Sequence, residues 1–331
     1  MDVHPALATV LCERLGLSYP ICQAGMGFLA RGDLAAAVSR AGGLGVMGAE
    51  GFTPEELRQE IRRVRDLTDR PFGVDILFGE VKGPQDEAVT RYTDTTQRMV
   101  DVVIDEAVPV LVSGLGSPRG AIADAHAQGM QVMSIVGNVR HALRLEADGV
   151  DWLIAQGHEA GGHTGRIGTL ALVPQIVDAV KLPVLAAGGI ADGRGLVAAL
   201  ALGACGAWMG TRFVAAREAY CHDNYKNRII DISEEGTVVS RAHSGKPCRL
   251  IRNAYTEYWD SHPEERLPFP QQHIQHGREA SRRARMQGEI DIGGMPAGQI
   301  SGMIRSVEGA ADIVQRLVRE SAAVLDRLVA G

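Results

Sequence analysis

The chain has 331 residues, and 34 lysines and arginines against 40 aspartates and glutamates give it a formal net charge of −6 at pH 7. Hydrophobic residues make up 45% and charged residues 22%, which is typical of a globular protein and excludes a disordered one. The mild acidity and the 5% of aromatic residues argue against a nucleic-acid surface, which needs a basic stripe and stacking rings. Glycine stands out with 40 residues, which indicates many tight backbone turns.

Membrane insertion, export and a cysteine framework find no support in the sequence. The longest uncharged apolar stretch, residues 195–211, is shorter than a membrane-spanning helix and is bounded by Arg194 and Arg212. The N-terminal residues show no basic segment followed by an apolar run, so we expect no export signal and a cytoplasmic location. The five cysteines are scattered and include no C-x-x-C pair, so they indicate neither a zinc site nor a disulfide framework.

Eight short apolar segments alternate with helical patterns over roughly the first two thirds of the chain. The predicted strands are residues 20–23, 44–47, 72–76, 109–112, 131–134, 151–156, 183–187 and 206–209. One intervening helix has a clear start, in which Thr53 is the N-cap, Pro54 the first helical residue and Glu56 the capping-box glutamate. Alternating strands and helices imply parallel pairing, and eight units predict an α/β protein of the TIM-barrel class, (β/α)8. A doubly wound open sheet is the alternative, but the alternation shows no break at a switch point.

The pattern changes after the eighth predicted strand. Residues 212–294 are more polar and contain isolated prolines, several histidines and an arginine-rich stretch, whereas residues 306–329 form one long amphipathic pattern. We therefore expect residues 1–211 and 306–331 to form the barrel, with the last helix as its eighth. Residues 212–305 would be a mainly helical insertion. Because active sites of such barrels lie on the loops that follow the strands, we expect this insertion to cover the active site.

The most informative loop follows the sixth predicted strand. It begins at Gln156 and contains two histidines, the second of which, His163, directly follows Gly161 and Gly162. The glycines allow the backbone to approach a ligand closely and favour His163 as a catalytic or ligand-contacting residue over a merely structural one. His158 has no such glycine support, and we interpret it mainly as a structural loop histidine.

Two further loops carry the signature of a phosphate site. The seventh predicted strand ends in Ala187, Gly188 and Gly189, and the eighth is followed by Gly210 and Thr211. In (β/α)8 barrels these two loops commonly bind phosphate through backbone N–H groups and a hydroxyl. The alternative interpretation is that the glycines serve only tight turns.

The first predicted strand ends in small residues next to a thioether. Ala24, Gly25 and Met26 would expose backbone and a flexible apolar group at the barrel mouth, which suits contact with a flat ring. Together with a phosphate site, this predicts a phosphorylated planar cofactor, for which FMN is the natural candidate. The sequence contains no histidine or carboxylate spacing typical of a metal centre, no P-loop and no nucleophile elbow.

These motifs taken together resemble the nitronate monooxygenase family, formerly called 2-nitropropane dioxygenase, and are also similar to its FMN-dependent enoyl-reductase and quinone-reductase relatives. The segments that carry the resemblance are residues 20–26, 41–45, 158–163, 187–194, 209–212 and 296–299.

The resemblance implies FMN as cofactor, no permanent metal and His163 as the catalytic residue. The residues expected to contact FMN are Ala24, Gly25, Met26, Asp75, Ser134, Gln156, Gly161, Gly162, Ala187, Gly188, Gly189, Gly210 and Thr211. Two of these depart from the family pattern. Asp75 stands where relatives commonly carry asparagine, and Ser134 lies where some relatives place a lysine near the flavin.

The resemblance leaves three functions open. The leading one is oxidation of an alkyl nitronate or nitroalkane by O2 to a carbonyl compound and nitrite. The alternative is an NAD(P)H-dependent reductase acting on quinones or enoyl thioesters. The arginines of residues 278–285 are a candidate phosphate site for such a reductase, although a solvated helix face is the favoured interpretation of them. The third is a flavin-binding protein without turnover. We expect no nucleic-acid or membrane partner, and a homodimer stays open.

Overall fold

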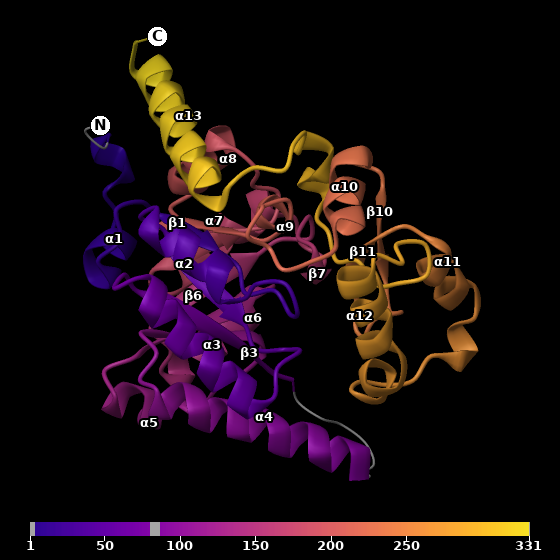
Figure 1. Cartoon of the computed structure of the whole chain (residues 1–331). Helices are drawn as coiled ribbons and strands as arrows, with labels where there is room; N and C mark the ends of the chain where they lie inside the picture. Colours follow the sequence, from indigo (N-terminus) through magenta and orange to yellow (C-terminus); the bar gives the residue numbers. More distant parts are fainter. Residues whose placement is uncertain (1–3, 80–86, 331) are drawn as a thin grey trace.

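The computed structural model describes residues 4–79 and 87–330 and contains a closed barrel of eight parallel strands (Figure 1). In barrel order the strands are β1 (Ile21–Gln23), β2 (Leu44–Gly48), β3 (Phe72–Phe78), β4 (Val110–Gly116), β5 (Gln131–Val136), β6 (Trp152–Gln156), β8 (Val184–Ala187) and β9 (Gly206–Met209). Closure is made by β1 and β9, where Cys22 lies beside Trp208. Each predicted strand overlaps one of these eight, so the predicted fold class is confirmed.

Helices connect successive strands on the outside of the barrel. After α1 (Val10–Leu15), they are α2 (Gly32–Arg40), α3 (Pro54–Leu67), α4 (Glu87–Asp105), α5 (Ile122–Ala127), α6 (Val139–Asp148), α7 (Thr169–Ala179) and α8 (Gly193–Ala201). Helix α3 begins with the predicted capping box, in which Glu56 N donates to the Thr53 hydroxyl and Thr53 N donates to the Glu56 carboxylate. Among the residues that the structure describes, no helix is both long and apolar enough to cross a bilayer.

The last helix, α13 (Ala310–Ala330), packs against α8 and α2 and so occupies the place of the eighth barrel helix (yellow in Figure 1). Gly193 N donates to the Glu320 carboxylate at 3.0 Å, and Gln315 Nε2 donates to Ala41 O at 3.3 Å. A Cβ atom at position 193 would collide with Ser321 N, so a glycine is needed for this close contact. The helix starts four residues later than the sequence pattern indicated, at Ala310.

The segment between β9 and α13 is not only helical. It contains α9 (Thr211–Val214), α10 (Asp223–Asp231), the hairpin strands β10 (Thr237–Ser240) and β11 (Cys248–Ile251), α11 (Ala254–Ser261) and α12 (Arg278–Gln287), with short helical turns at Pro263–Glu265, His273–Gly277 and Gln299–Met303. The hairpin pairs with β7 (Gly162–His163), a two-residue strand in the loop after β6, and the three strands form a small antiparallel sheet. The sequence patterns indicated the helices but not this sheet.

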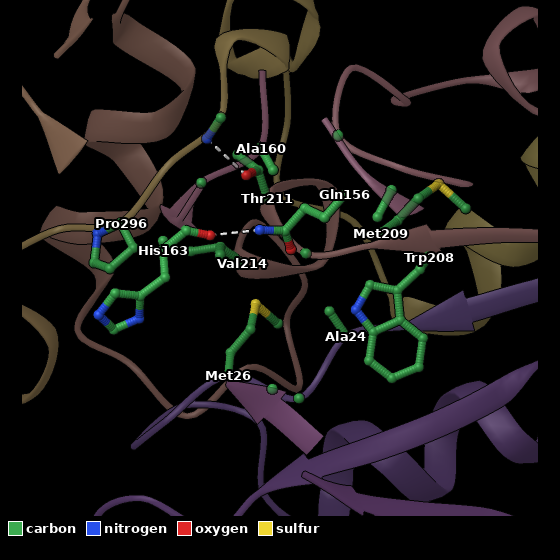
Figure 2. Close-up of a pocket in the computed structure, with 18 of the residues that line it drawn as sticks. Ala24, Met26, Gln156, Ala160, His163, Trp208, Met209, Thr211, Val214 and Pro296 are labelled. Carbon is green, nitrogen blue, oxygen red and sulfur yellow. Dashed lines mark hydrogen bonds between the residues drawn. The ribbon is translucent and has the colours of Figure 1, made fainter. Parts of the chain in front are cut away.

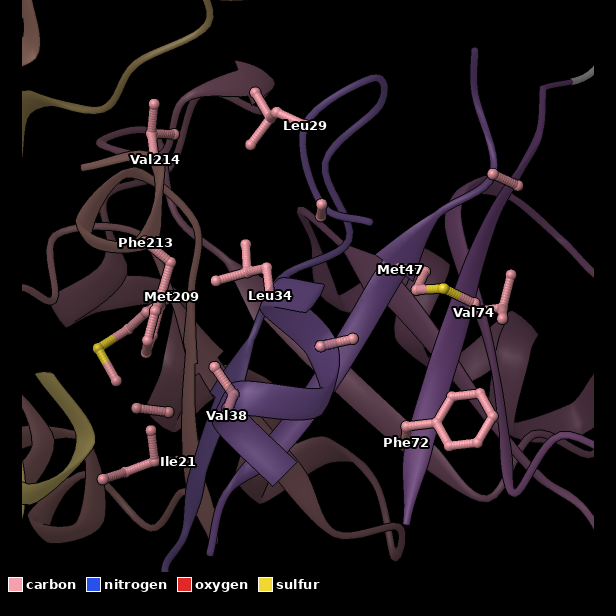
Figure 3. Packing of buried hydrophobic residues seen from close by; sticks show 14 of the residues in the cluster. Ile21, Leu29, Leu34, Val38, Met47, Phe72, Val74, Met209, Phe213 and Val214 are labelled. Carbon is pink, nitrogen blue, oxygen red and sulfur yellow. The ribbon is translucent and has the colours of Figure 1, made fainter. Parts of the chain in front are cut away.

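Two apolar clusters fill the barrel and its outer layer. Successive residues of β4 point into different clusters. Val110 and Val112 belong to the smaller cluster, together with Trp152, whereas Leu111 belongs to the larger one. Figure 3 shows part of the larger cluster, in which side chains of the strands pack against α2. This packing holds the carboxyl ends of the strands, and therefore the loops that follow them, in fixed positions.

Candidate active site

A cavity opens where the barrel strands end, and nearly all of the predicted site residues line it (Figure 2). The predicted residues in its lining are Ala24, Gly25, Met26, Asp75, Gln156, Gly161, Gly162, His163, Ala187, Gly188, Gly189, Gly210 and Thr211. Ser134 lies outside this lining; it is fully buried in β5, and its hydroxyl has no hydrogen-bond partner within the described part of the chain. The strand ends therefore bring together residues that are as far as 187 positions apart.

One side of the cavity consists of main-chain groups from the loops after β8 and β9. Gly188 and Gly189 have φ angles of +88° and +75°, which side chains rarely tolerate. A Cβ atom at Gly188 would lie 3.1 Å from Ala160 N, so the loop also packs too closely for a larger residue. Thr211 Oγ1 accepts a hydrogen bond from Gly298 N at 2.9 Å, which leaves the hydroxyl hydrogen available to a ligand. Such exposed backbone beside a hydroxyl fits a phosphate group.

The adjoining surface is shaped by small residues and could hold a flat ring. A Cβ atom added at Gly210 would lie 3.7 Å from both Ala24 Cβ and Met26 Sδ, an ordinary contact distance. The glycine is therefore not required by its protein neighbours, and its absent side chain leaves room within the cavity. The thioether of Met26 lies at the cavity and can adapt its shape to a ring.

Asp75 places a buried carboxyl group in the lining. Its exposed fraction is 8%, and its Oδ1 atom has no hydrogen-bond partner among the described residues. Burial raises the pKa of Asp75 well above its ordinary value, and nearby Glu50 adds to this effect, while a hydrogen bond from the Gly114 backbone opposes it. The protonated carboxyl is thus favoured and can donate a hydrogen bond, as the amide of an asparagine would.

His163 lies on β7, where it is paired with Cys248 of the hairpin. Its Nε2 atom is 2.7 Å from Ser244 Oγ, and its carbonyl accepts a hydrogen bond from the Gln156 amide (Figure 2). Burial lowers the pKa of His163 to about 4, with opposition from Glu50. The imidazole is therefore neutral near pH 7, the form that can accept a proton.

A row of imidazoles extends from His163 towards the loop after β2. The ring centroids of His163 and His243 are 5.7 Å apart, those of His243 and His273 are 5.2 Å apart, and His273 Nε2 is 3.1 Å from Glu50 Oε1. Burial alone would raise the pKa of Glu50, but the charge and hydrogen bond of His273 outweigh it and hold the pKa below its usual range. Burial, reinforced by His273, lowers the pKa of His243 well below its ordinary value.

Several residues in and beside this cavity could not be predicted from the sequence. Glu50, His243 and His273 offer potential metal-ligand atoms within 4.8 Å of one another, although their spacing along the chain matches no metal motif. Ser244, beside His163, lies in the insertion, where a single serine carries no recognisable signal. The only indication was the number of histidines in residues 212–294.

Three arginines of the arginine-rich stretch in α12 contact other residues of the chain. Arg282 pairs with Glu279 at 2.7 Å, and Arg283 pairs with Glu289. Arg285 is buried and donates to the carbonyl of Gly27 at 2.7 Å, which ties α12 to the loop after β1.

His158 stabilises the loop that follows β6. Its Nδ1 atom lies 2.8 Å from the carbonyl of Gly165, and its own carbonyl accepts two hydrogen bonds from Arg249. These contacts agree with the structural interpretation of His158.

The barrel and the cavity at its mouth define a (β/α)8 protein whose strand ends could hold a cofactor. A family model described as nitronate monooxygenase matches residues 8–320, so the chain belongs to the nitronate monooxygenase family, as the resemblance indicated. Membership in this family implies a flavin cofactor. The small residues, the exposed backbone and the unpartnered Asp75 oxygen described above fit such a group.

Three relatives illustrate the range of the similarity. A protein of Rhodococcus jostii named "(3aS,4S,5R,7aS)-5-hydroxy-7a-methyl-1-oxo-octahydro-1H-indene-4-carboxyl-CoA dehydrogenase" is 39% identical over 74% of this chain, which spans 66% of that relative's length. The structure of FabK from Thermotoga maritima is 36% identical, with a TM-score of 0.86, over 97% of this chain and 98% of that one. Nitroalkane oxidase from Streptomyces ansochromogenes is 33% identical, with a TM-score of 0.85, over 96% of this chain and 99% of that one.

Proposed function

We propose that this protein is an FMN-dependent nitronate monooxygenase that oxidises alkyl nitronates with O2 to carbonyl compounds and nitrite. The observation that carries the proposal is the position of the His163 imidazole, which Ser244 holds in the same cavity as the glycine loops after β8 and β9. Similarity to a nitroalkane oxidase over almost the whole chain supports it.

The glycine loops are the proposed site of the cofactor phosphate. Gly188, Gly189, Gly210 and Thr211 would hold this group through backbone N–H groups and the Thr211 hydroxyl. The flavin ring would lie against residues 24–26. When bound, FMN supplies the electron transfer between the substrate and O2; the protein supplies binding, orientation and proton transfer.

His163 has two proposed roles. For a nitronate, which arrives as an anion, a ring N–H would donate a hydrogen bond to a nitro oxygen and orient the substrate. For a neutral nitroalkane, the neutral imidazole would accept the proton from the carbon next to the nitro group. When Nε2–H donates to Ser244, Nδ1 carries the lone pair that this step needs.

We also propose that residues 212–305 form a cap over the barrel mouth. Tyr225, His243, Cys248 and Arg285 of this segment line the same cavity as the barrel loops. Arg285 of this segment donates a hydrogen bond to the carbonyl of Gly27, in the loop after β1. The cap would exclude water from the substrate and supply Ser244 to the imidazole.

A second candidate is an NAD(P)H-dependent FMN reductase acting on quinones or enoyl thioesters. It is favoured by the 39% identity to a dehydrogenase whose name specifies a coenzyme A thioester. Both candidates need the same cofactor and the same imidazole, and they differ in the molecule that delivers electrons.

Anaerobic mixing of the FMN-loaded protein with each reductant distinguishes the candidates. We expect a nitronate such as propyl-2-nitronate to bleach the flavin absorbance near 450 nm within seconds, and subsequent O2 to restore it with release of nitrite. Bleaching by NADH or NADPH but not by the nitronate would overturn the monooxygenase proposal in favour of the reductase. A protein that cannot be reconstituted with FMN would contradict both.

A further inference from the structure

Three side chains that the proposed reaction does not use come together at the edge of the active-site cavity. Glu50 lies in the loop after β2, His243 in the loop between β10 and β11, and His273 in the helical turn before α12. Each offers a nitrogen or oxygen atom, and these atoms all lie within 4.8 Å of one another. We call this group the Glu-His-His cluster. One member comes from a barrel loop and two come from the segment after β9.

The donor atoms of the cluster are of the kind that a transition-metal ion prefers. His243 and His273 are buried, with exposed fractions of 4% and 6%, and the Glu50 side chain is 19% exposed. Two imidazoles and a carboxylate are common ligands of Zn²⁺ and of other divalent ions of the first transition series. Mg²⁺ and Ca²⁺ prefer oxygen ligands throughout. The cluster therefore favours a transition metal over these two ions.

The shortest separation in the cluster suits two ligands of one ion. Glu50 Oε1 is 3.1 Å from His273 Nε2, but the two groups are poorly aligned for a hydrogen bond. Bonds of about 2.1 Å place two ligand atoms of a tetrahedral zinc ion about 3.4 Å apart. The remaining separations, none above 4.8 Å, require an adjustment of at most about 1.4 Å. An ion can therefore contact all three residues after a modest movement of side chains.

Neighbouring residues hold the carboxylate and one of the imidazoles. A Cβ atom at position 27 would lie 2.6 Å from Glu50 Oε2, so Gly27 makes room for the carboxylate beside it. His243 Nδ1 lies 3.4 Å from the hydroxyl of Ser281, which is itself fully buried. A contact of this kind to the second ring nitrogen is typical of metal-binding histidines, because it fixes the orientation of the ring.

The charge of Arg285 opposes a cation at this place. Arg285 acts electrostatically on both Glu50 and His243, and its guanidinium donates to the carbonyl of Gly27. It offsets part of the negative charge that Glu50 supplies. We therefore expect an ion that exchanges with the solution and does not stay bound during purification.

We propose that the Glu-His-His cluster binds a divalent transition-metal ion, represented here by Zn²⁺. Three protein ligands leave at least one position open on a four-coordinate ion. Glu50 and His243 line the active-site cavity, so a water molecule or an anionic oxygen atom in the cavity would complete the coordination. The ion would add a positively charged anchor close to His163, whose ring centroid is 5.7 Å from that of His243. The site goes beyond the proposed oxidation, which needs no metal.

Titration of the FMN-loaded protein with Zn²⁺, followed by calorimetry after removal of any affinity tag, tests the proposal. We expect one Zn²⁺ ion to bind per chain, and an excess of Mg²⁺ or Ca²⁺ not to displace it. Co²⁺ serves as a spectroscopic probe of the same site. It should give visible absorption bands of a nitrogen-ligated ion at wavelengths longer than those of the flavin.

The variants Glu50→Gln and His243→Gln each remove one ligand. Each should raise the Kd for Zn²⁺ by about a hundredfold or more, since loss of a residue that only supports a ligand already costs about 10–100-fold. Glu50→Gln nearly preserves the shape of the side chain, and flavin content and circular dichroism check that both variants are folded. His126→Gln is the matched control. His126 is exposed outside the cavity, 2.9 Å from Asp151, and its replacement should leave the Kd unchanged.

Three results would overturn the proposal: no binding of Zn²⁺ to the wild type, a Kd that neither cluster variant alters, or a Kd that His126→Gln raises as much as they do. The last result would assign the ion to the protein surface. The binding measurements need no turnover. If the wild type fails to oxidise nitronates but binds Zn²⁺ with the expected response to the variants, the monooxygenase proposal fails and the metal site stands.

Discussion

The two sides of the active-site cavity are constructed in different ways. The loops after β8 and β9 present backbone, with Gly188 and Gly189 at positive φ. The other side presents the imidazoles of His163 and His243, which come from segments 80 residues apart in the chain. The first side comes from barrel loops and has one hydrogen bond from the segment after β9, from Gly298 N to Thr211. The second side is formed where β7 pairs with β11 of that segment. The residues proposed to bind the cofactor and those proposed to act on the substrate therefore come mainly from different parts of the structure.

The largest expected effect is on the backbone side. Gly210→Val should abolish FMN binding, because the new side chain would occupy space in the cavity that no protein atom fills. The nearest atoms to a Cβ at this position are 3.7 Å away, so the fold itself should tolerate the change. Flavin content is read from the absorbance spectrum of the purified protein, and folding from circular dichroism.

Gly120→Val is the control for this substitution. Gly120 is exposed, and a Cβ atom there would have no neighbour within 4 Å. The control should retain its flavin. If Gly210→Val also retains a full complement of FMN, the phosphate and ring do not lie where we place them.

The second largest effect is expected on catalytic activity when His163 is replaced. His163→Asn keeps a hydrogen-bonding group but cannot take up a proton, so activity on neutral nitroalkanes should fall by about 10²–10⁴-fold, the range typical of a lost acid–base group. Activity on preformed nitronates should fall much less, and FMN content should not change. Steady-state nitrite release with the two substrate forms measures both effects. Equal losses on both would assign the imidazole to substrate orientation only.

A smaller effect is expected at Ser244, which positions His163 through the 2.7 Å contact to Nε2. Ser244→Ala should lower kcat by about fivefold, since the loss of one such hydrogen bond corresponds to about 1 kcal/mol. KM and flavin content should change little. Ser244→Thr retains a hydroxyl and should restore most of the rate; if it is as impaired as Ser244→Ala, the hydroxyl does not orient the ring.

The smallest predicted effect is on stability in acid. Burial lowers the pKa of His163 to about 4 in the folded protein, while an unfolded histidine titrates near 6.5. The unfolded state thus binds more protons between these values. The free energy of unfolding should then fall as the pH drops from 6.5 towards 4, with a contribution of about 1–3 kcal/mol from this histidine.

Urea denaturation across this pH range measures the loss of free energy of unfolding. The free energy of unfolding should depend less steeply on pH in His163→Asn than in the wild type. The substitution His126→Asn is the comparison, because His126 is exposed and lies beside Asp151, the residue that directly precedes β6. An identical slope in wild type and His163→Asn would show that His163 does not titrate in this way.

The backbone side of the cavity and His163 could be predicted from the sequence, but the other side chains that surround His163 could not. Gly188 and Gly210 directly follow predicted strands. Their positions at the barrel mouth can be predicted locally, because the end of a barrel strand fixes where the next residues lie. The same holds for His163, which two glycines and a predicted strand precede.

The contacts of Glu50, His243 and Ser244 have no local cause. Their positions follow from the pairing of β11 with β7 and from the packing of α12 on the loop after β1. Long-range pairing of a short hairpin leaves little periodicity in the sequence, and two residues are too few for β7 to be recognised as a strand. The sequence therefore predicts the order of the barrel strands. It does not predict the row of imidazoles formed by His163, His243 and His273.

The pairing of β7 with β11 sets a limit on how the enzyme can change during evolution. His163 belongs to β7, which pairs with β11 of the segment after β9. The position of His163 is therefore coupled to the position of that segment. Replacing the segment after β9 would therefore also displace His163, the residue proposed to act on the substrate. Divergence within this scaffold should accordingly be easiest in barrel loops that do not pair with this segment, where residues can be exchanged one at a time.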